Sequence, residues 1–285
     1  MTVKDVIAFQ GVPGAYSDMA CRAARPDMTT LPCASFEDTF AAVHDGLARF
    51  AMIPIENSSA GRVADIHHLL PDSGLHIIGE HFQKVEHQLL APPGATMDSI
   101  QTVHSHVQAL SQCRLYTRRQ GIRPVVHADT AGAAKEVAEL GDPTRAAIAS
   151  ELAAETYGLQ ILDANVQDIP HNTTRFIIMA EEPIDPPMDD GPVVTTFVFR
   201  VRSVPAALYK ALGGFATNGV NITKLESYII DGSFTVAQFY ADVEGHPENR
   251  MVRLALEELS FFSREVKILG VYPANPFRGT DNGDD

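Results

Sequence analysis

The stretch His171-Asn172-Thr173-Thr174-Arg175-Phe176, followed by Ile177-Ile178-Met179, decides how the rest of the chain is interpreted. It is the start of a predicted strand, polar at first and then apolar. Arginine is a permanently charged planar fork for carboxylates, and threonine can both donate and accept a hydrogen bond. These side chains favour an anion-binding or proton-transfer site. The alternative is a strand start whose polar residues satisfy loose backbone groups.

The composition limits the class of protein. The chain has 285 residues, of which 45% are hydrophobic and 20% charged, and its net charge is −14. This length allows more than one domain, and this composition is typical of a soluble globular protein. Nucleic acid is not an expected partner, because binding it requires a basic face. An anionic ligand would have to bind through local positive features.

The cysteines and the first residues indicate a cytoplasmic protein. Cys21, Cys33 and Cys113 have no metal-ligand spacing and are expected to be reduced thiols. The histidine pairs have no nearby cysteine or carboxylate cluster, so no metal site is predicted. The start of the chain has no signal-peptide pattern. No apolar run approaches the length of a membrane span, so no membrane is expected as a partner.

Strands and helices alternate from about residue 5 to 180, which favours α/β layers with largely parallel strands. The pattern predicts helices at residues 130–140 and at 108 to about 119, for example, and a strand at residues 193–201 beyond this region. In such sheets, ligands bind in the loops at the carboxyl ends of strands. Polar loops follow three predicted strands, at residues 11–17, 56–61 and 104–112. The strand that begins near Thr173 is polar at its start instead. We infer that it runs antiparallel to the others, which would bring its start to the same edge.

A second domain follows an acidic, proline-rich linker at residues 183–192. Residues 193–273 are predicted to form a β-α-β-β-α-β, ferredoxin-like domain, with a hairpin turn at Asp231-Gly232. Residues 274–285 are predicted to be a disordered tail.

Four motifs resemble those of prephenate dehydratase, and they occur in that family's order. The second domain resembles the ACT regulatory domain, most clearly at Asn221-Ile222-Thr223-Lys224-Leu225-Glu226-Ser227. Together the matches cover nearly the whole chain outside the linker and the tail. The four motifs are Gly11-Val12-Pro13-Gly14-Ala15-Tyr16-Ser17, Pro54-Ile55-Glu56-Asn57-Ser58-Ser59-Ala60-Gly61-Arg62-Val63, His106-Val107-Gln108-Ala109-Leu110-Ser111-Gln112-Cys113 and Asn172-Thr173-Thr174-Arg175-Phe176.

The resemblance implies a two-lobed α/β catalytic domain at residues 1–182, similar to the type II periplasmic binding proteins, followed by a ferredoxin-like ACT domain. One lobe would combine about residues 1–75 with 163–180, and the other would hold about residues 76–162. The site would lie in the cleft between the lobes.

The resemblance also implies a reaction, the conversion of prephenate to phenylpyruvate, carbon dioxide and water in phenylalanine biosynthesis. The ring becomes aromatic, so the driving force lies in the substrate. The enzyme must hold a dianion and leave the departing carboxylate partly desolvated. It must also donate to the leaving hydroxyl, which is worth roughly 10²–10⁴-fold in rate. This chemistry requires no metal, redox cofactor or covalent intermediate.

By this resemblance, Thr174 is the donor at the leaving hydroxyl. Arg175 would bind a carboxylate through two hydrogen bonds, and an internal ion pair is its alternative role. Glu56 is expected to be structural, because a carboxylate repels a dianion. Asn172 and Thr173 are expected to shape the turn. Further substrate contacts are expected from Tyr16, Ser17, Asn57, Ser58, Ser59, Gly61, His106, Gln108, Ser111 and Phe176, although capping explains His106, Gln108 and Ser111 equally well and Phe176 is expected mainly to pack.

The second domain departs from the family at the phenylalanine site. The family commonly has Gly-Ala-Leu where this chain has Ala206-Ala207-Leu208, and Glu-Ser-Arg-Pro where it has Glu226-Ser227-Tyr228-Ile229. Feedback inhibition by L-phenylalanine, bound by these segments and Asn221, is still the expectation. The added methyl group of Ala206 could crowd the ligand. The alternative is a dimerisation module that binds no ligand.

Three functions therefore stay open. Prephenate dehydration is the expected activity, in a homodimer or homotetramer joined through the ACT-like domains. The same chemistry on arogenate is the nearest alternative. A catalytically silent small-molecule sensor is the other, and the intact stretch 172–176 argues against it.

Overall fold

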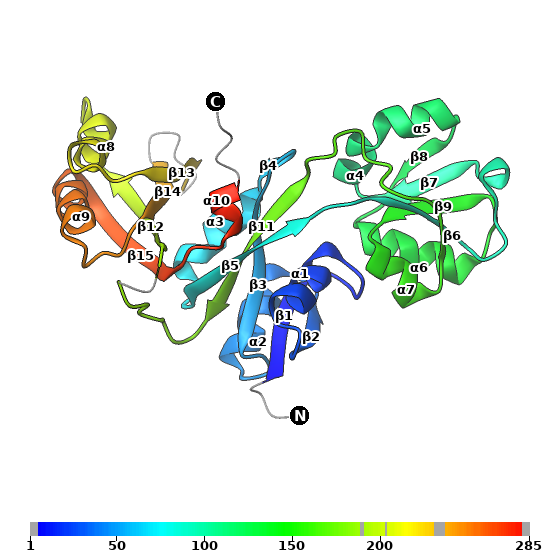
Figure 1. The fold of residues 1–285 in the computed structure, drawn as a ribbon, viewed down its shortest axis with the longest axis horizontal. Helices are drawn as coiled ribbons and strands as arrows, with labels where there is room; N and C mark the ends of the chain where they lie inside the picture. Colours follow the sequence, from blue (N-terminus) through cyan, green and yellow to red (C-terminus); the bar gives the residue numbers. More distant parts are fainter. Residues whose placement is uncertain (1–4, 189–190, 203, 231–236, 281–285) are drawn as a thin grey trace. The chain divides into compact units, whose positions relative to one another are not determined.

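The computed structural model describes residues 5–188, 191–202, 204–230 and 237–280. The chain forms two compact units, residues 1–62 with 82–176 and residues 63–81 with 177–285, called the first and second unit below. Strands β5 (His76–Lys84) and β11 (Thr173–Ala180) have residues in both units. The fold is mixed α/β (Figure 1).

Three parallel strands in the order β3-β1-β2 open the first unit, and the short β4 pairs antiparallel with β3. The middle of β1 is fully buried, as expected for an apolar strand between two others. Helix α2 begins with a capping box between Ser35 and Asp38. The elements are β1 Val6–Gln10, α1 Tyr16–Ala24, β2 Thr29–Cys33, α2 Phe36–His44, β3 Phe50–Asn57 and β4 Gly61–Arg62.

A five-stranded mixed sheet in the order β10-β6-β9-β7-β8 forms the rest of the first unit. Side chains of β9 alternate between its faces: Ala146 and Ile148 pack with α4 and α5, and Ala147 and Ala149 pack with α6 and α7 (Figure 1). The elements are β6 Gln88–Ala91, β7 Thr102–Ser105, α4 Val107–Gln112, α5 Arg114–Gln120, β8 Arg123–Val126, α6 Thr130–Leu140, β9 Arg145–Ala149, α7 Glu151–Tyr157 and β10 Gln160–Asp163.

The turn after β1 lies against the start of α7. Gly14 has φ +84°, and a Cβ added there would lie 2.8 Å from the Cα of Ala153. Ser150 Oγ donates to the Gly14 carbonyl at 2.5 Å, and the Tyr157 hydroxyl donates to the Pro13 carbonyl at 2.7 Å. Glycine is required here because the turn needs a positive φ and a backbone approaches closely.

The second unit contains a four-stranded antiparallel sheet in the order β13-β14-β12-β15. Residues of α8 and α9 share one buried cluster with β12 and β14. This strand order is the one that a β-α-β-β-α-β, ferredoxin-like arrangement has. Residue Gly270 of β15 also pairs with Ile77 of β5, in parallel. The elements are α3 Ala64–Leu69, β12 Val193–Val201, α8 Ala207–Thr217, β13 Ile222–Ile229, β14 Ala237–Glu244, α9 Arg250–Phe262, β15 Ser263–Pro273 and α10 Phe277–Thr280.

The segment that follows β15 has a defined structure. Asn275 N–H donates to Glu80 Oε1 at 3.0 Å, and α10 follows. The prediction of a disordered tail is therefore wrong for residues 274–280, because their partner lies 195 positions away in the sequence. Residues 281–285 of that tail, residues 189–190 of the predicted linker and the predicted turn at Asp231-Gly232 lie outside the described residues.

Candidate active site

Thr174 and Asn57 meet where β3 ends and β11 begins. Asn57 is the last residue of β3, and Thr174 is the second residue of β11. The Ser58 N–H donates to the Thr173 carbonyl at 2.9 Å, and Ser58 Oγ accepts from the Thr173 N–H at 3.0 Å. The start of β11 therefore lies at the edge where β3 ends, as the sequence predicted.

The Asn57 side chain sets the direction of the Thr174 hydroxyl. Asn57 Oδ1 accepts from the backbone N–H groups of Ser59 and Ala60, at 2.9 and 2.8 Å. Because backbone donors hold the oxygen, the nitrogen faces Thr174, and Nδ2 donates to Thr174 Oγ1 at 2.9 Å. Within the part of the chain that the structure describes, the proton of this half-buried hydroxyl has no acceptor. Thr174 can therefore donate that proton to a ligand oxygen.

Asn57 is also linked to side chains deeper in the first unit. Asn57 Nδ2 donates to Asn172 Oδ1 at 2.8 Å, and Asn172 Nδ2 donates to Gln112 Oε1 at 3.1 Å. The same Gln112 oxygen lies 2.8 Å from His87 Nε2, and His87 Nδ1 lies 2.8 Å from the Tyr16 hydroxyl. We call this set the hydrogen-bond chain: Tyr16, His87, Gln112, Asn172, Asn57 and Thr174.

Burial controls the protonation of the two titratable members of the chain. It lowers the pKa of His87, and the hydrogen bond with Gln112 opposes this shift. It raises the pKa of the Tyr16 hydroxyl well above its ordinary value, and the Cys113 and Glu86 side chains add to the rise. The Tyr16 hydroxyl also donates to the Glu86 carbonyl at 2.8 Å. At neutral pH the imidazole is therefore neutral and the phenol is protonated.

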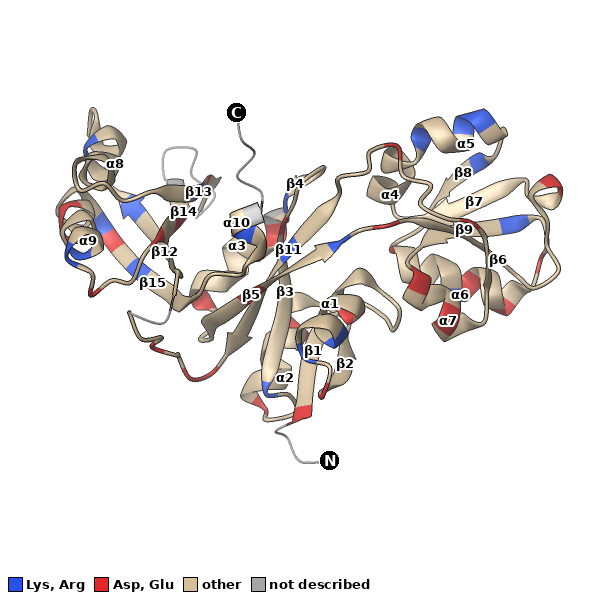
Figure 2. Cartoon of the chain, viewed as in Figure 1, with Lys and Arg blue, Asp and Glu red and all other residues tan. Residues whose placement is uncertain are grey.

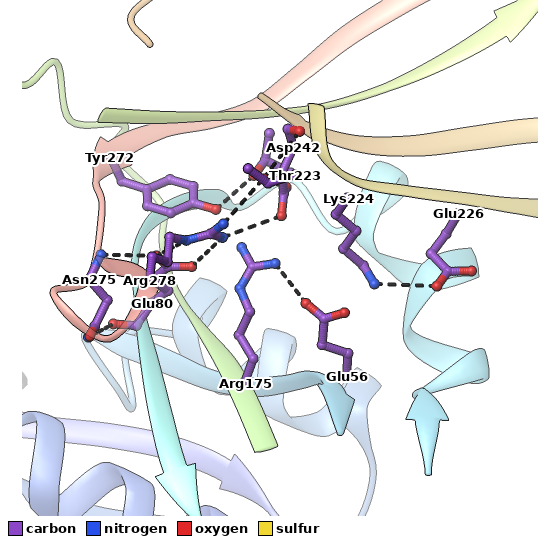
Figure 3. Close-up of polar contacts among 11 residues, drawn as sticks. Glu56, Glu80, Arg175, Thr223, Lys224, Glu226, Asp242, Tyr272, Asn275 and Arg278 are labelled. Carbon is purple, nitrogen blue, oxygen red and sulfur yellow. Dashed lines mark hydrogen bonds and ion pairs between the residues drawn. The ribbon is translucent and has the colours of Figure 1, made fainter. Parts of the chain in front are cut away.

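Arg175 lies on the opposite face of β11 from Thr174, because successive side chains of a strand point to opposite faces. Arg175 is only 3% exposed. Its Nη1 donates to Glu56 Oε1 at 2.9 Å (Figure 3). The structure thus contains the internal ion pair that was the alternative role for Arg175. Its role as an anchor for a substrate carboxylate stays a prediction.

The loop after β3 brings three predicted residues beside Asn57. Ser58, Ser59 and Gly61 are exposed. Ser58 Oγ and Ser59 Oγ lie 3.4 and 3.5 Å from the His171 carbonyl, to which they donate. Gly61 has φ +80°, a conformation that favours glycine. This loop could present hydroxyl and backbone groups to a ligand.

The remaining predicted contacts are more scattered. His106 caps α4, since its Nδ1 accepts from the Gln108 N–H at 3.3 Å. Gln108 and Ser111 are exposed on α4, and Ser17 is half-buried in the first turn of α1. Phe176 is 1% exposed and belongs to the core. Of the predicted residues, Tyr16, Asn57 and Thr174 are the ones that the hydrogen-bond chain brings together.

The roles of Gln112, Asn172 and His87 were not predicted from the sequence. Asn172 was expected to shape the turn, but it is 1% exposed and lies in the middle of the hydrogen-bond chain. The available signal for His87 was polarity within an apolar run, because Glu86-His87-Gln88 interrupts residues that are otherwise typical of a buried strand. For Gln112 the signal was its place in the family-like motif at residues 106–113, directly after Ser111.

The predicted effector residues lie on two elements of the second unit. Ala206 is the N-cap of α8 and has φ +61°, Ala207 is buried, and Leu208 packs on the core. The other predicted effector residues lie at β13. Asn221 Nδ2 donates to the Glu244 carboxylate at 3.1 Å, and the Glu226 carboxylate lies 3.4 Å from Lys224 Nζ. Ser227 is exposed on β13. A glycine at position 206 would adopt this positive φ without the steric cost of a Cβ.

A second polar cluster, the Arg278 cluster, lies in the second unit (Figure 3). Arg278 donates to both oxygens of Glu80, at 2.6 and 2.8 Å. Its Nη2 lies 3.6 Å from Asp242 Oδ2, and its Nη1 donates to Thr223 at 3.2 Å. The side chains of Glu80 and Asp242 are fully buried. Arg278 therefore supplies positive charge to two buried carboxylates.

Charge is unevenly distributed in the first unit. Arg114, Arg118 and Arg119 gather on α5 (Figure 2), whereas the hydrogen-bond chain contains no lysine or arginine. Over the described ranges, no three His, Cys, Asp or Glu side chains lie close enough together to hold a metal ion. None of the described helices has the length and hydropathy needed to cross a membrane. Because the hydrogen-bond chain contains no lysine or arginine, the donors that it offers to a ligand are neutral.

Known proteins share this fold and sequence. The family model for prephenate dehydratase matches residues 7–184. A bifunctional N-acyl-homoserine lactone acylase/prephenate dehydratase of Komagataeibacter europaeus is 57% identical over 98% of this chain and 99% of that protein. The chloroplastic arogenate dehydratase/prephenate dehydratase 1 of Arabidopsis thaliana is 40% identical over 95% of this chain and 73% of that protein.

A solved structure gives the same result for the fold. The prephenate dehydratase of Arthrobacter aurescens, in complex with L-Phe, has a TM-score of 0.84 and 31% identity, and the match covers 94% of this chain and 89% of that chain. The fold and the site define a mixed α/β protein with hydroxyl and amide groups at a strand edge. The chain belongs to the prephenate dehydratase family, a family of lyases.

Proposed function

We propose that the protein is a prephenate dehydratase that makes phenylpyruvate for L-phenylalanine biosynthesis. The observation that supports this most is the Thr174 hydroxyl, whose oxygen accepts a hydrogen bond from Asn57 Nδ2 at 2.9 Å. With its oxygen occupied in this way, the hydroxyl directs its proton toward a ligand. A leaving hydroxyl group needs such a donor.

The proposed reaction breaks two bonds of prephenate. The bond between the ring and its carboxylate breaks, the electron pair moves into the ring, and the carbon–oxygen bond to the hydroxyl breaks as the ring becomes aromatic. The leaving oxygen takes up one proton and departs as water. A threonine hydroxyl is a weak acid, so Thr174 orients or relays that proton. This contribution is worth roughly 10²–10⁴-fold in rate.

The substrate is a dianion, and the site must hold it against a net charge of −14. Ser58, Ser59 and Gly61 would contact its oxygens through hydroxyl and backbone groups. Arg175 would bind a carboxylate only by exchanging Glu56 for the substrate. Loss of charge from the departing carboxylate is favoured where few charged groups solvate it. The chemistry needs no metal or cofactor.

We also propose the finer organisation of the chain. Residues 1–182 would form a two-lobed catalytic domain similar to type II periplasmic binding proteins, and residues 193–273 would form an ACT domain that binds L-phenylalanine. The family match at residues 7–184 and the strand order β13-β14-β12-β15 support this division. So does the related structure described in complex with L-Phe. A cytoplasmic homodimer or homotetramer is the expected assembly.

The activity can be tested with purified protein supplied with prephenate or arogenate separately. Formation of phenylpyruvate from prephenate is the expected result, and phenylalanine formed only from arogenate would transfer the proposal to that substrate. Activity on neither would contradict both and favour a sensor. Titration calorimetry with L-phenylalanine tests the ACT domain, where no heat and no inhibition would remove the effector role.

The role of Thr174 can be tested in the same assay. Thr174→Ala should lower kcat by about 10²–10⁴-fold, because the leaving oxygen loses its donor. Thr174→Ser retains a hydroxyl and should stay within about tenfold of the unmodified protein. The free energy of unfolding should change little, since Thr174 is half-buried. A near-normal kcat for Thr174→Ala would move the donor role to another group.

A second candidate function comes from the relative that is 57% identical over 98% of this chain, whose name includes N-acyl-homoserine lactone acylase. Hydrolysis of an acyl-homoserine lactone would release a fatty acid and the amine of homoserine lactone. An amine-reactive reagent measures that release directly. Absence of amine at an enzyme concentration that turns over prephenate would limit the protein to dehydration.

A further inference from the structure

The hydrogen-bond chain has a direction, and the backbone sets it. Two backbone N–H groups, of Ser59 and Ala60, occupy Asn57 Oδ1 at 2.9 and 2.8 Å. Asn57 must therefore donate from Nδ2 to Asn172, and Asn172 must accept with Oδ1, at 2.8 Å. That choice turns the Asn172 nitrogen toward Gln112, at 3.1 Å from Oε1.

The orientation of Gln112 determines the tautomer of His87. Gln112 must present Oε1 to the Asn172 nitrogen, and this same oxygen faces His87 Nε2 at 2.8 Å. An oxygen acceptor requires an N–H group at Nε2. A neutral imidazole has one N–H group, so His87 Nδ1 is an acceptor. The single Tyr16 proton is then shared between His87 Nδ1 and the Glu86 carbonyl, each 2.8 Å from the hydroxyl oxygen.

We propose that His87 is a positioning residue of the dehydration, whose neutral Nε2–H tautomer holds the amides in the one orientation that leaves the Thr174 proton for the substrate. This inference rests on the proposed function. Carboxamide side chains do not relay protons as water or imidazole does. His87 therefore acts by orienting Gln112. Gln112 in turn holds Asn172, and Asn172 reinforces the orientation that the Ser59 and Ala60 N–H groups give to Asn57.

The opposite tautomer conflicts with the rest of the chain. If His87 Nε2 carried no proton, Gln112 would have to turn its nitrogen toward the imidazole and its oxygen away. Two N–H donors would then face each other, either between Gln112 and Asn172 or, if Asn172 also turned, between Asn172 and Asn57. His87 is 2% exposed, so water does not readily repair such a mismatch.

Nitrogen NMR of imidazole-¹⁵N-labelled protein at pH 7.5 tests the tautomer without any substrate. The chain has eleven histidines, so the His87 signals are identified by their loss in His87→Gln. We expect a protonated nitrogen at Nε2 and an unprotonated one at Nδ1. In Asn57→Asp, which replaces the Nδ2 donor by an oxygen, the protonated position should move to Nδ1. A protonated Nδ1 in the unmodified protein, or no change in Asn57→Asp, overturns the inference.

Kinetics test the positioning role. His87→Leu removes the Nε2–H donor, and kcat should fall about 10- to 100-fold, with KM within about threefold, because a misplaced donor acts on the transition state. His87→Gln can place an amide N–H near the same point and should recover most of that loss. The matched control is His104→Leu. His104 is 8% exposed in the same unit, lies 3.1 Å from Thr102 Oγ1 and is outside the chain, so its kcat should not change.

The outcomes separate the two proposals. If the unmodified protein is active and His87→Leu keeps its kcat, or if His87→Gln is as impaired as His87→Leu, the positioning role is overturned while the dehydratase function stands. If the unmodified protein acts on neither prephenate nor arogenate, the proposed function fails, and the nitrogen spectra still decide whether His87 sets the orientation of the chain. Those spectra also decide the case in which His87→Leu does not fold.

Discussion

Neighbouring residues of β11 serve different purposes. Thr174 presents a hydroxyl whose oxygen is held by Asn57, and Arg175 forms a buried ion pair with Glu56 at 2.9 Å. The alternation of side chains along a strand separates the two roles, although the residues are adjacent in sequence. A polar motif on a strand therefore does not by itself describe one site.

At the residue scale, the backbone of Ala206 gives a stability prediction. This residue has φ +61° at the start of α8, where a Cβ costs about 1–2 kcal/mol. Ala206→Gly removes that cost, and the greater entropy of an unfolded glycine offsets part of the gain. The expected net gain is about 0.5–1 kcal/mol in the free energy of unfolding, measured by urea denaturation.

A helical alanine provides the control for that measurement. Ala216 is exposed on α8, and Ala216→Gly should lose about 0.5–1 kcal/mol, because glycine disfavours the helix. Gains or losses of the same sign for both variants would show that the conformation of Ala206 is not the cause.

At the scale of elements, local patterns predicted much of the fold. The helix at residues 130–140 and the strand at 193–201 were expected with the bounds that the structure has. One predicted helix, residues 108–119, is instead split at Cys113 into α4 and α5. The carboxylate of Asp168 accepts from the N–H groups of Leu115 and Tyr116, at 2.9 and 3.1 Å. Such a cap from a distant segment cannot be predicted from local periodicity.

The strand β2 was not predicted at all. It contains Pro32, which local reasoning takes as evidence against a strand, but β2 is at the end of the strand order, where proline is tolerated. The candidate site, like the fold, could be predicted only in part. Thr174 and Asn57 could be expected from the sequence, whereas the links from Asn172 to Gln112 and from Gln112 to His87 span 60 and 25 positions.

The turn between β1 and α1 provides a prediction about an element. Gly14→Ala should cost more than about 2 kcal/mol in the free energy of unfolding, because the methyl group meets the Ala153 backbone at 2.8 Å in addition to the cost of φ +84°. Gly46 has φ +68° with no atom within 4 Å of an added Cβ. Gly46→Ala should therefore cost only about 1 kcal/mol. Equal costs in urea unfolding would contradict the close approach to α7.

At the scale of the whole chain, the Arg278 cluster joins positions far apart in the sequence. Glu80, Thr223 and Asp242 all contact Arg278, and the two carboxylates are fully buried. Removing the cation leaves the two buried carboxylates without this counter-charge, and breaking a buried ion pair costs about 3–5 kcal/mol in other proteins. Arg278→Ala should destabilise the protein by about this amount, measured by urea unfolding.

An exposed ion pair is the control for the Arg278 cluster. Arg253 lies 4.0 Å from Glu257, and both side chains are more than half exposed. Arg253→Ala should change the free energy of unfolding by less than about 0.5 kcal/mol. In the double variant Arg278→Leu/Glu80→Leu, part of the loss should return, since no charged Glu80 is left buried. If Arg278→Ala cost no more than Arg253→Ala, the cluster would not be a stabilising contact.

The ion pair between Arg175 and Glu56 has a consequence for evolution. Glu56 and Arg175 belong to two of the motifs by which the chain resembles its family. Counting matched motif residues would treat them as two independent indications of catalysis. As partners at 2.9 Å, with Arg175 almost fully buried, they are expected to be gained and lost together among descendants of a common ancestor. A relative that has lost one of the two residues is therefore expected to have lost the other as well.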